Sequence, residues 1–291
     1  MNPETMLGAF ATLASAWEVQ AGPKPGLVDR FGSGAHDDMD YLTFLLSTCA
    51  LSPYWALQAR VGLDGTPPRN AMGRLRETGL EMERAMLGAT SGVNTHKGLI
   101  FALSLLLFGA GSCLSSTGRI DPPEAARLSA EAVKETVLSE FHALSRSGYP
   151  AGRTHGERLF LERGITGIRG EASSGFPSVL SRGLPALHRA LEAGASLNDA
   201  ALSSLFSIAA VCEDSNVITR GGFHFWRDVH RERMQELAAE CPPYSPAFIE
   251  ELQRLDAEYS SHGVSPGGAA DLLSCTLFLH WGQLVNKREL S

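Results

Sequence analysis

Apolar side chains recur every three or four residues along most of the chain, which is the spacing of amphipathic helices. One stripe precedes Gly22 and Pro23 and consists of Met6, Leu7, Phe10, Leu13, Ala14 and Trp17. Two further stripes consist of Met72, Leu75, Gly79, Met82 and Met86, and of Phe248, Leu252, Leu255 and Tyr259. No series of alternating strands interrupts this pattern. We therefore expect an all-α fold of about ten helices in one compact domain spanning residues 1–291.

Helix start signals occur where the apolar stripes or runs begin. The segment Asp121-Pro122-Pro123-Glu124 combines an N-cap side chain, a proline in the first turn and an acidic residue. Ser196 to Asp199 resembles a capping box, and Ser245-Pro246 is a third start signal. These three segments predict helices that begin near residues 122, 197 and 246.

The longest apolar run extends from Leu99 to Leu114. It is shorter than a membrane-spanning helix normally requires, and serine and glycine residues interrupt it. We therefore interpret this run as a buried central helix and expect no membrane association.

The composition narrows the possible partners and the cellular compartment. The net charge of −7 disfavours a broad nucleic-acid-binding surface, which requires an excess of basic residues. Five widely spaced cysteines without a CxxC pair disfavour a disulfide framework or a thiolate zinc site. The N-terminus lacks the basic region of a signal peptide. We expect a soluble cytoplasmic protein that does not bind nucleic acid.

Five segments between the expected helices combine glycine with charged or amide side chains. They are residues 23–39, 90–98, 164–177, 213–222 and 265–271. One such loop would be unremarkable, but five favour a shared site that is built from helix-connecting loops.

The first segment carries candidate metal ligands. Asp29, His36 and Asp38 combine the carboxylates that suit Mg²⁺ with an imidazole that can transfer protons. Asp37 and Asp38 could instead cap the following helix, and capping remains the preferred interpretation for Asp37.

The segment from residue 91 to 98 resembles a phosphate-binding turn. Its glycines flank a helix N-terminus, where free backbone N–H groups attract anions. Lys97 would add positive charge, while Asn94, Thr95 and His96 would donate or accept hydrogen bonds. Lys24, like Lys97, is one of only four lysines and also lies in one of the five segments. A capping turn with a solvated lysine is an equally simple interpretation.

The later segments supply further arginines and acids. Arg169 and Arg220 each lie beside glycine, which allows close approach of a guanidinium group to phosphate oxygens. Ion pairs between Arg169 and Glu171, or between Asp214 and Arg220, are the structural alternatives. Asp271 could cap the last helix or bind a metal ion.

Common catalytic motifs are absent, with one misleading exception. Residues 263–267 match the serine-hydrolase pattern GxSxG, but Pro266 follows the serine. Proline has no N–H to contribute to an oxyanion hole, so we reject this interpretation.

The same segments resemble the triphosphoribosyl-dephospho-CoA synthase family, which serves citrate lyase and malonate decarboxylase. The resemblance covers nearly the whole chain and rests on Glu18 with PKPGLVDR (23–30), GAHDDM (34–39), Glu83 with ATSGVNTHKG (89–98), TGIRGEASSGFP (166–177), DSNVITRGG (214–222) and SPGGAADLL (265–273). It implies that the 5-triphosphoribosyl group of ATP is transferred to the 2′-hydroxyl of 3′-dephospho-CoA, with release of adenine. The product would pass to a separate acyl-carrier-protein transferase.

The resemblance and the residue chemistry together suggest roles. Phosphate binding would involve Lys24, Asn94, Thr95, His96, Lys97, Arg169, Asn216 and Arg220. Mg²⁺ would be bound by Asp29, Asp38, Asp214 and Asp271. Glu83 and Glu171 would act as base or stabilise positive charge on the ribose, with His36 as the alternative base.

Two other functions are compatible with the sequence. A Mg²⁺-dependent ADP-ribosyl or nucleoside N-glycohydrolase would also use several aspartates, but it would transfer the ribosyl group to water. A non-catalytic protein that binds CoA-type nucleotides or an acyl carrier protein would bind ligand without forming product.

Overall fold

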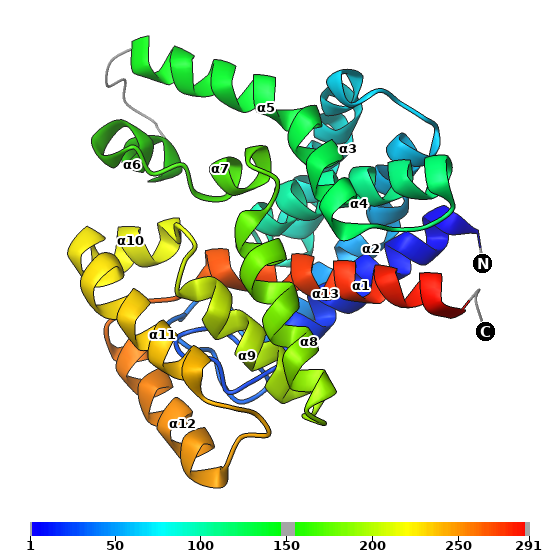
Figure 1. The fold of residues 1–291 in the computed structure, drawn as a ribbon. Helices are drawn as coiled ribbons and strands as arrows, with labels where there is room; N and C mark the ends of the chain where they lie inside the picture. The colour runs from blue at the N-terminus through cyan, green and yellow to red at the C-terminus, as the bar shows by residue number, and fades with distance from the viewer. Residues whose placement is uncertain (1, 147–154, 289–291) are drawn as a thin grey trace.

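Helices form all the regular structure of the described residues, which are 2–146 and 155–288 in a computed structural model (Figure 1). The α-helices are α1 (Pro3–Gln20), α2 (Tyr41–Leu63), α3 (Pro68–Ala89), α4 (Lys97–Thr117), α5 (Pro122–Arg146), α6 (His155–Arg163), α7 (Gly167–Ser173), α8 (Leu184–Glu192), α9 (Leu197–Ala209), α10 (Ser215–Gly221), α11 (Arg231–Ala239), α12 (Pro246–Ser261) and α13 (Gly267–Arg288). Two π-helical segments, Val179–Gly183 and Phe225–His230, precede α8 and α11. The all-α expectation is confirmed.

The described part of the chain has thirteen α-helices, against about ten expected. The short helices α7 and α10 lie inside segments 164–177 and 213–222, which were expected to be loops. Each contains seven residues, too few to form a stable helix in isolation, so tertiary contacts must hold them. The candidate site is therefore built from short helices as well as from loops.

The three predicted helix starts are confirmed. Helix α5 begins at Pro122, and Asp121 accepts a hydrogen bond from the Glu124 N–H at 3.2 Å. The Ser196 hydroxyl caps α9 through the Asp199 N–H at 3.1 Å. The Ser245 hydroxyl caps α12 in the same way, through the Phe248 N–H at 3.2 Å. Local side-chain-to-backbone hydrogen bonds thus set these boundaries.

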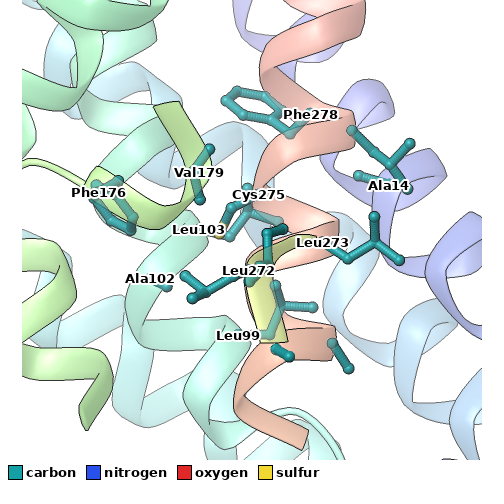
Figure 2. Close-up of a cluster of buried hydrophobic side chains, with 14 of the residues drawn as sticks. Ala14, Leu99, Ala102, Leu103, Phe176, Val179, Leu272, Leu273, Cys275 and Phe278 are labelled. Carbon is teal, nitrogen blue, oxygen red and sulfur yellow. The ribbon is translucent and has the colours of Figure 1, made fainter. Parts of the chain in front are cut away.

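Helices α4 and α13 form the centre of the fold. Helix α4 is the one described helix long and apolar enough to cross a membrane, yet most of its side chains are buried against other helices, as expected for a core helix. Helix α13 runs through the middle of Figure 1 and contacts α1, α4 and α9. In Figure 2, Leu272 and Cys275 of α13 lie beside Leu99 and Leu103 of α4.

The buried face of α1 differs slightly from the predicted stripe. Leu7, Ala11 and Ala14 are fully buried, whereas Leu13 is 43% exposed. The same face continues to Glu18, four residues after Ala14, which is only 5% exposed. The helical repeat therefore places a carboxylate at the end of an otherwise apolar face.

Candidate active site

A cavity with a volume of 660 Å³ lies at the N-terminal ends of α4, α10 and α13. Residues from all five glycine-containing segments line it, together with Glu18 of α1. The loop between α1 and α2 reaches the cavity because side chains of other helices hold its backbone. Asp256 of α12 accepts from the Gly26 N–H at 2.8 Å, and Asn198 of α9 accepts from the Gly22 N–H at 3.0 Å.

Acidic side chains outnumber basic ones on the cavity wall. The carboxylates that line it are Glu18, Asp38, Glu171, Glu213 and Asp271. Among the described lining residues, the lysine and arginine side chains are Lys97 and Arg220. A polyphosphate entering this cavity would therefore require additional positive charge.

Glu18 forms a buried ion pair with Lys24. The Lys24 ammonium group also donates to the backbone carbonyl of Glu18, and neither side chain is substantially exposed. Burial raises the pKa of Glu18, although the positive charge of Lys24 acts in the opposite direction. Lys24 was expected to bind phosphate, but it does not line the cavity and instead neutralises Glu18, which does.

Asp271 packs against the backbone at the start of α4. A Cβ atom added to Gly98 would lie 2.1 Å from Asp271 Oδ2, so only glycine permits this contact. Burial raises the pKa of Asp271 well above its ordinary value, and the neighbouring carboxylates of Glu18 and Asp214 raise it further. Because α13 begins at Gly267, Asp271 lies within the helix and is not its N-cap.

Ser178 donates two hydrogen bonds to Glu171. Glu171 Oε1 accepts from the Ser178 N–H at 2.7 Å, and Glu171 Oε2 accepts from the Ser178 hydroxyl at 3.0 Å. Burial raises the pKa of Glu171, while both Ser178 hydrogen bonds lower it. A fixed carboxylate with a raised pKa on a cavity wall is a candidate general base.

His96 is held in its neutral form. Its Nδ1 lies 2.6 Å from the Ser47 hydroxyl of α2, and burial lowers the pKa of His96 to about 3. The Thr95 hydroxyl donates to the same Ser47 oxygen at 2.8 Å. Within the described residues, His96 Nε2 has no hydrogen-bond partner. His96 therefore offers an uncharged contact to a ligand in the cavity.

His36 and Asp38 lie together on the cavity wall. His36 Nδ1 is 3.7 Å from Asp38 Oδ1, and Asp38 is largely exposed. Burial and the nearby Arg220 charge lower the pKa of His36. The capping interpretation of Asp37 and Asp38 is wrong. Asp40 caps α2 instead, by accepting from the Thr43 N–H at 2.8 Å.

The N-terminus of α4 contributes the predicted segment 94–98 to the cavity wall. Asn94 Oδ1 accepts from the Lys97 N–H at 3.2 Å, which satisfies one backbone donor at the start of α4. The Lys97 ammonium group lies 2.9 Å from the Glu83 carboxylate of α3. Glu83 does not line the cavity, so its position matches a partner of Lys97 better than it matches a catalytic base.

Arg220 and Asn216 come from α10. Arg220 lines the cavity and donates to the backbone carbonyls of Ala35 and Gly263 at 3.3 and 3.2 Å. These bonds join its own segment to segment 23–39 and to the turn that precedes segment 265–271. Asn216 also lines the cavity. A Cβ atom on Gly267 would lie 2.7 Å from Asn216 Nδ2, so these two residues are closely packed.

Two of the predicted metal ligands bind the backbone instead. Asp214 caps α10 through the N–H groups of Asn216 and Val217, and its other oxygen accepts from the Ala269 N–H at 2.9 Å. Asp29 accepts from the N–H groups of Lys24, Phe31 and Gly32 within its own loop. Both are buried and neither lines the cavity, so their oxygens are committed to holding the loops in place.

Arg169 also lies away from the main cavity. It faces Glu140 of α5 at 3.5 Å. The two ion pairs suggested as structural alternatives, Arg169–Glu171 and Asp214–Arg220, are both absent among the described residues.

Two carboxylates on the cavity wall, Glu18 and Glu213, have no role predicted from the sequence. Glu18 had a recognisable signal, because it continues the buried face of α1. Glu213 accepts hydrogen bonds from the Thr166 N–H at 2.7 Å and from the Gly167 N–H at 3.1 Å. It thereby fixes the start of α7 against the start of α10. No sequence feature distinguishes Glu213 from an ordinary exposed glutamate.

Comparisons with known proteins identify relatives of this chain over nearly its whole length. The profile of the ATP:dephospho-CoA triphosphoribosyl transferase family matches residues 4–289. A Pectobacterium atrosepticum protein named 2-(5″-triphosphoribosyl)-3′-dephosphocoenzyme-A synthase is 37% identical over 272 residues, covering 92% of this chain and 86% of the relative.

Two further relatives have the same name with the qualifier "Probable". The Streptococcus mutans serotype c protein is 37% identical over 281 residues, covering 94% of both chains. The Vibrio cholerae serotype O1 protein is 37% identical over 280 residues, covering 94% of this chain and 87% of the relative. No solved structure matches the chain significantly.

Proposed function

The chain belongs to the ATP:dephospho-CoA triphosphoribosyl transferase family, and from this membership we propose that it transfers the triphosphoribosyl group of ATP to the 2′-hydroxyl of 3′-dephospho-CoA. The observation that carries the proposal is the convergence of all five family-like segments on one cavity. A shared nucleotide site explains why segments so far apart in the chain are brought together.

The proposed reaction exchanges one bond at the anomeric carbon of the ATP ribose. The bond from C1′ to adenine N9 breaks, and a bond from C1′ to the acceptor 2′-oxygen forms. Adenine leaves with the bonding electrons and takes up a proton, while the acceptor hydroxyl loses one. The triphosphate is unchanged, so it serves as the part of ATP that the protein holds.

Glu171 is the best-placed residue to accept the hydroxyl proton. The two Ser178 hydrogen bonds fix its carboxylate at the cavity wall, and burial raises its pKa. A base with a raised pKa removes a proton more readily in the transition state. The carboxylate charge would also stabilise the positive charge that develops on the ribose as adenine departs.

Lys97, Arg220 and His96 would bind the triphosphate. Lys97 and Arg220 are exposed on the wall, where they can reach phosphate oxygens. The unpaired Nε2 of His96 would donate a hydrogen bond without adding charge.

Mg²⁺ fits the electrostatics of this wall. Within the described residues, no group of three or more His, Cys, Asp or Glu side chains is close enough to form a metal site. Protein-bound Mg²⁺ usually has one or two carboxylate ligands together with substrate phosphates and water. Glu18 and Asp271 both line the cavity, and burial together with the nearby charge of Glu18 raises the pKa of Asp271. Bound Mg²⁺ would supply the positive charge that a triphosphate needs there.

The product would serve as the prosthetic-group precursor of an acyl carrier protein, delivered by a separate transferase in the cytoplasm.

Mass spectrometry of the purified protein incubated with ATP, Mg²⁺ and dephospho-CoA tests the central reaction. We expect a product whose mass equals dephospho-CoA plus the triphosphoribosyl group. Tight nucleotide binding without that product would favour a binding protein and contradict the proposal.

A further inference from the structure

A second cavity adjoins the proposed nucleotide site. This groove has a volume of 380 Å³ and lies between α3, α4, α5 and α7. Lys97, Gly98 and Ile168 line both the groove and the main cavity, so the two spaces share a wall at the start of α4.

The interior of the groove is mainly apolar but contains an unpaired hydroxyl group. Leu75, Ile100, Leu105 and Val137 are buried side chains of its wall. Ser104 also lines the groove, is only 4% exposed, and makes no side-chain hydrogen bond among the described residues. A buried hydroxyl group without a partner is energetically unfavourable, so a ligand group that pairs with Ser104 would be stabilised.

Charged side chains that form ion pairs also line the groove. Lys97 lies 2.9 Å from Glu83, and Arg169 lies 3.5 Å from Glu140. These side chains are partly exposed, and such ion pairs contribute little stability, so phosphate oxygens can compete for the two cations.

Dephospho-CoA has three parts that correspond to this arrangement. Its ribose must enter the main cavity, because the 2′-hydroxyl reacts there. The diphosphate follows the ribose and matches the position of Lys97 at the shared wall. The pantetheine arm comes next and combines methyl groups with amide groups, which match apolar walls containing one unpaired hydroxyl.

We propose that this groove binds the pantetheine arm of dephospho-CoA, with the Ser104 hydroxyl bonded to an amide group of the arm. The inference rests on the proposed function, since it names the subsite of the acceptor. Lys97 lies between the two substrates and contacts the acceptor diphosphate.

Gly79 of α3 allows the groove to be filled without disturbing the core. A Cβ atom there would have one neighbour within 4 Å, Ile100 Cγ2 at 3.9 Å. Gly79→Phe would therefore place an aromatic ring in the groove. Gly73→Phe is the matched control, because Gly73 lies on an exposed face of the same helix with no atom within 4 Å of an added Cβ.

Steady-state kinetics with each substrate varied in turn test the inference. We expect Gly79→Phe to raise the KM for dephospho-CoA by about tenfold or more, as pocket substitutions commonly do, and to leave the KM for ATP unchanged. Inhibition by 4′-phosphopantetheine would weaken in parallel. Gly73→Phe would change none of these values. Equal changes in both KM values, or no difference between the two variants, would overturn the inference.

A second pair of variants preserves the test if the phenylalanine disrupts folding. Ser104→Ala removes a hydroxyl that has no partner within the described fold, so its thermal stability is expected to be retained. The KM for dephospho-CoA would rise about threefold or more, the effect of one lost hydrogen bond. Ser112→Ala is the control, because Ser112 is another unpaired hydroxyl on α4 but does not line the groove. Identical KM values for the two alanine variants would contradict the role of Ser104.

Calorimetric titration with dephospho-CoA separates this inference from the proposed function. Weaker binding to Gly79→Phe than to Gly73→Phe supports the groove whether or not product is formed. If the wild-type protein binds dephospho-CoA more tightly than Gly79→Phe does but makes no product, the proposed reaction is contradicted and the binding role of the groove is still supported. Equal affinity of both variants for dephospho-CoA would show that the groove does not bind the pantetheine arm, and it would not bear on the proposed reaction.

Discussion

The Ser47 hydroxyl of α2 lies 2.6 Å from His96 Nδ1, at the point where the polypeptide enters α4. The Thr95 hydroxyl donates to the same oxygen, which leaves the Ser47 proton available for His96. In that arrangement His96 Nδ1 accepts and Nε2 carries the ring proton. A buried serine distant in sequence therefore prepares His96 to donate a hydrogen bond into the cavity.

Ser47→Ala tests this arrangement. The substitution leaves Nδ1 of a buried imidazole without its serine partner, which costs about 1–3 kcal/mol of unfolding free energy. We also expect ¹⁵N NMR to show that His96 no longer holds a single tautomer. Ser116→Ala is the control, because Ser116 is exposed and bonds only to carbonyls of its own helix. An unchanged tautomer in Ser47→Ala would show that Ser47 does not set it.

Loss of the buried partner of Glu18 is expected to destabilise the protein far more than loss of an exposed ion-pair partner. Lys24→Met leaves the Glu18 carboxylate buried without its partner, which is expected to cost about 3–5 kcal/mol in denaturant unfolding. Arg60→Met removes the exposed partner of Glu4 and is expected to cost about 0–1 kcal/mol.

The double variant Lys24→Met with Glu18→Gln completes this test. It removes the unpaired charge, so it is expected to regain part of the lost stability. If the double variant were no more stable than Lys24→Met, the destabilisation would not come from the isolated carboxylate.

The hydrogen bonds to Glu171 predict the direction of a pH shift. If Glu171 is the base, it acts when ionised, so activity falls as the pH decreases through its raised pKa. Ser178→Ala removes the hydroxyl that stabilises the ionised form, so the pKa of Glu171 would rise further above its ordinary value. The acidic limb of kcat/KM would therefore move to higher pH.

Ser181→Ala is the appropriate control for this profile, because the Ser181 hydroxyl bonds to the Pro177 carbonyl and not to Glu171. A limb that stays in place in Ser178→Ala, or moves to lower pH, would exclude Glu171 as the group that titrates.

If Asp271 is a Mg²⁺ ligand, its substitution should weaken the Mg²⁺-dependent binding of ATP. Saturation with Mg²⁺ and ATP at about 100 times the dissociation constant would stabilise the wild-type protein by about 2.7 kcal/mol. We expect Asp271→Asn to lose the part of this stabilisation that requires Mg²⁺ while it still folds. Asp64→Asn is the control, because Asp64 pairs with Arg74 at the surface. If Mg²⁺ stabilised Asp271→Asn as much as the wild-type protein, Asp271 would not be a ligand of the metal ion.

The sequence predicts best those features that depend on neighbouring residues. Ser196 and Ser245 cap helices through hydrogen bonds to residues three positions later, so the local sequence reveals both boundaries. The local sequence does not predict the short helix α10. Contacts with α6, α13 and the π-helical segment that follows it stabilise this helix, and these contacts depend on residues distant in the chain.

The roles of single charged residues were harder to predict. Asp29 and Asp214 lie in glycine-containing segments just as Asp38 and Asp271 do, but their carboxylates bind backbone N–H groups. Nothing in the local sequence shows which way a carboxylate points. Lys24 likewise belongs to a family-like segment but turns inward to Glu18.

Adenine release from ATP, measured with and without dephospho-CoA, tests the central claim most directly. The proposed transfer predicts that adenine appears only when dephospho-CoA is present, in equal amounts with the triphosphoribosylated product. Adenine release at the same rate without dephospho-CoA would mean that water accepts the ribosyl group. The protein would then be an N-glycohydrolase, and the proposed transfer would be contradicted.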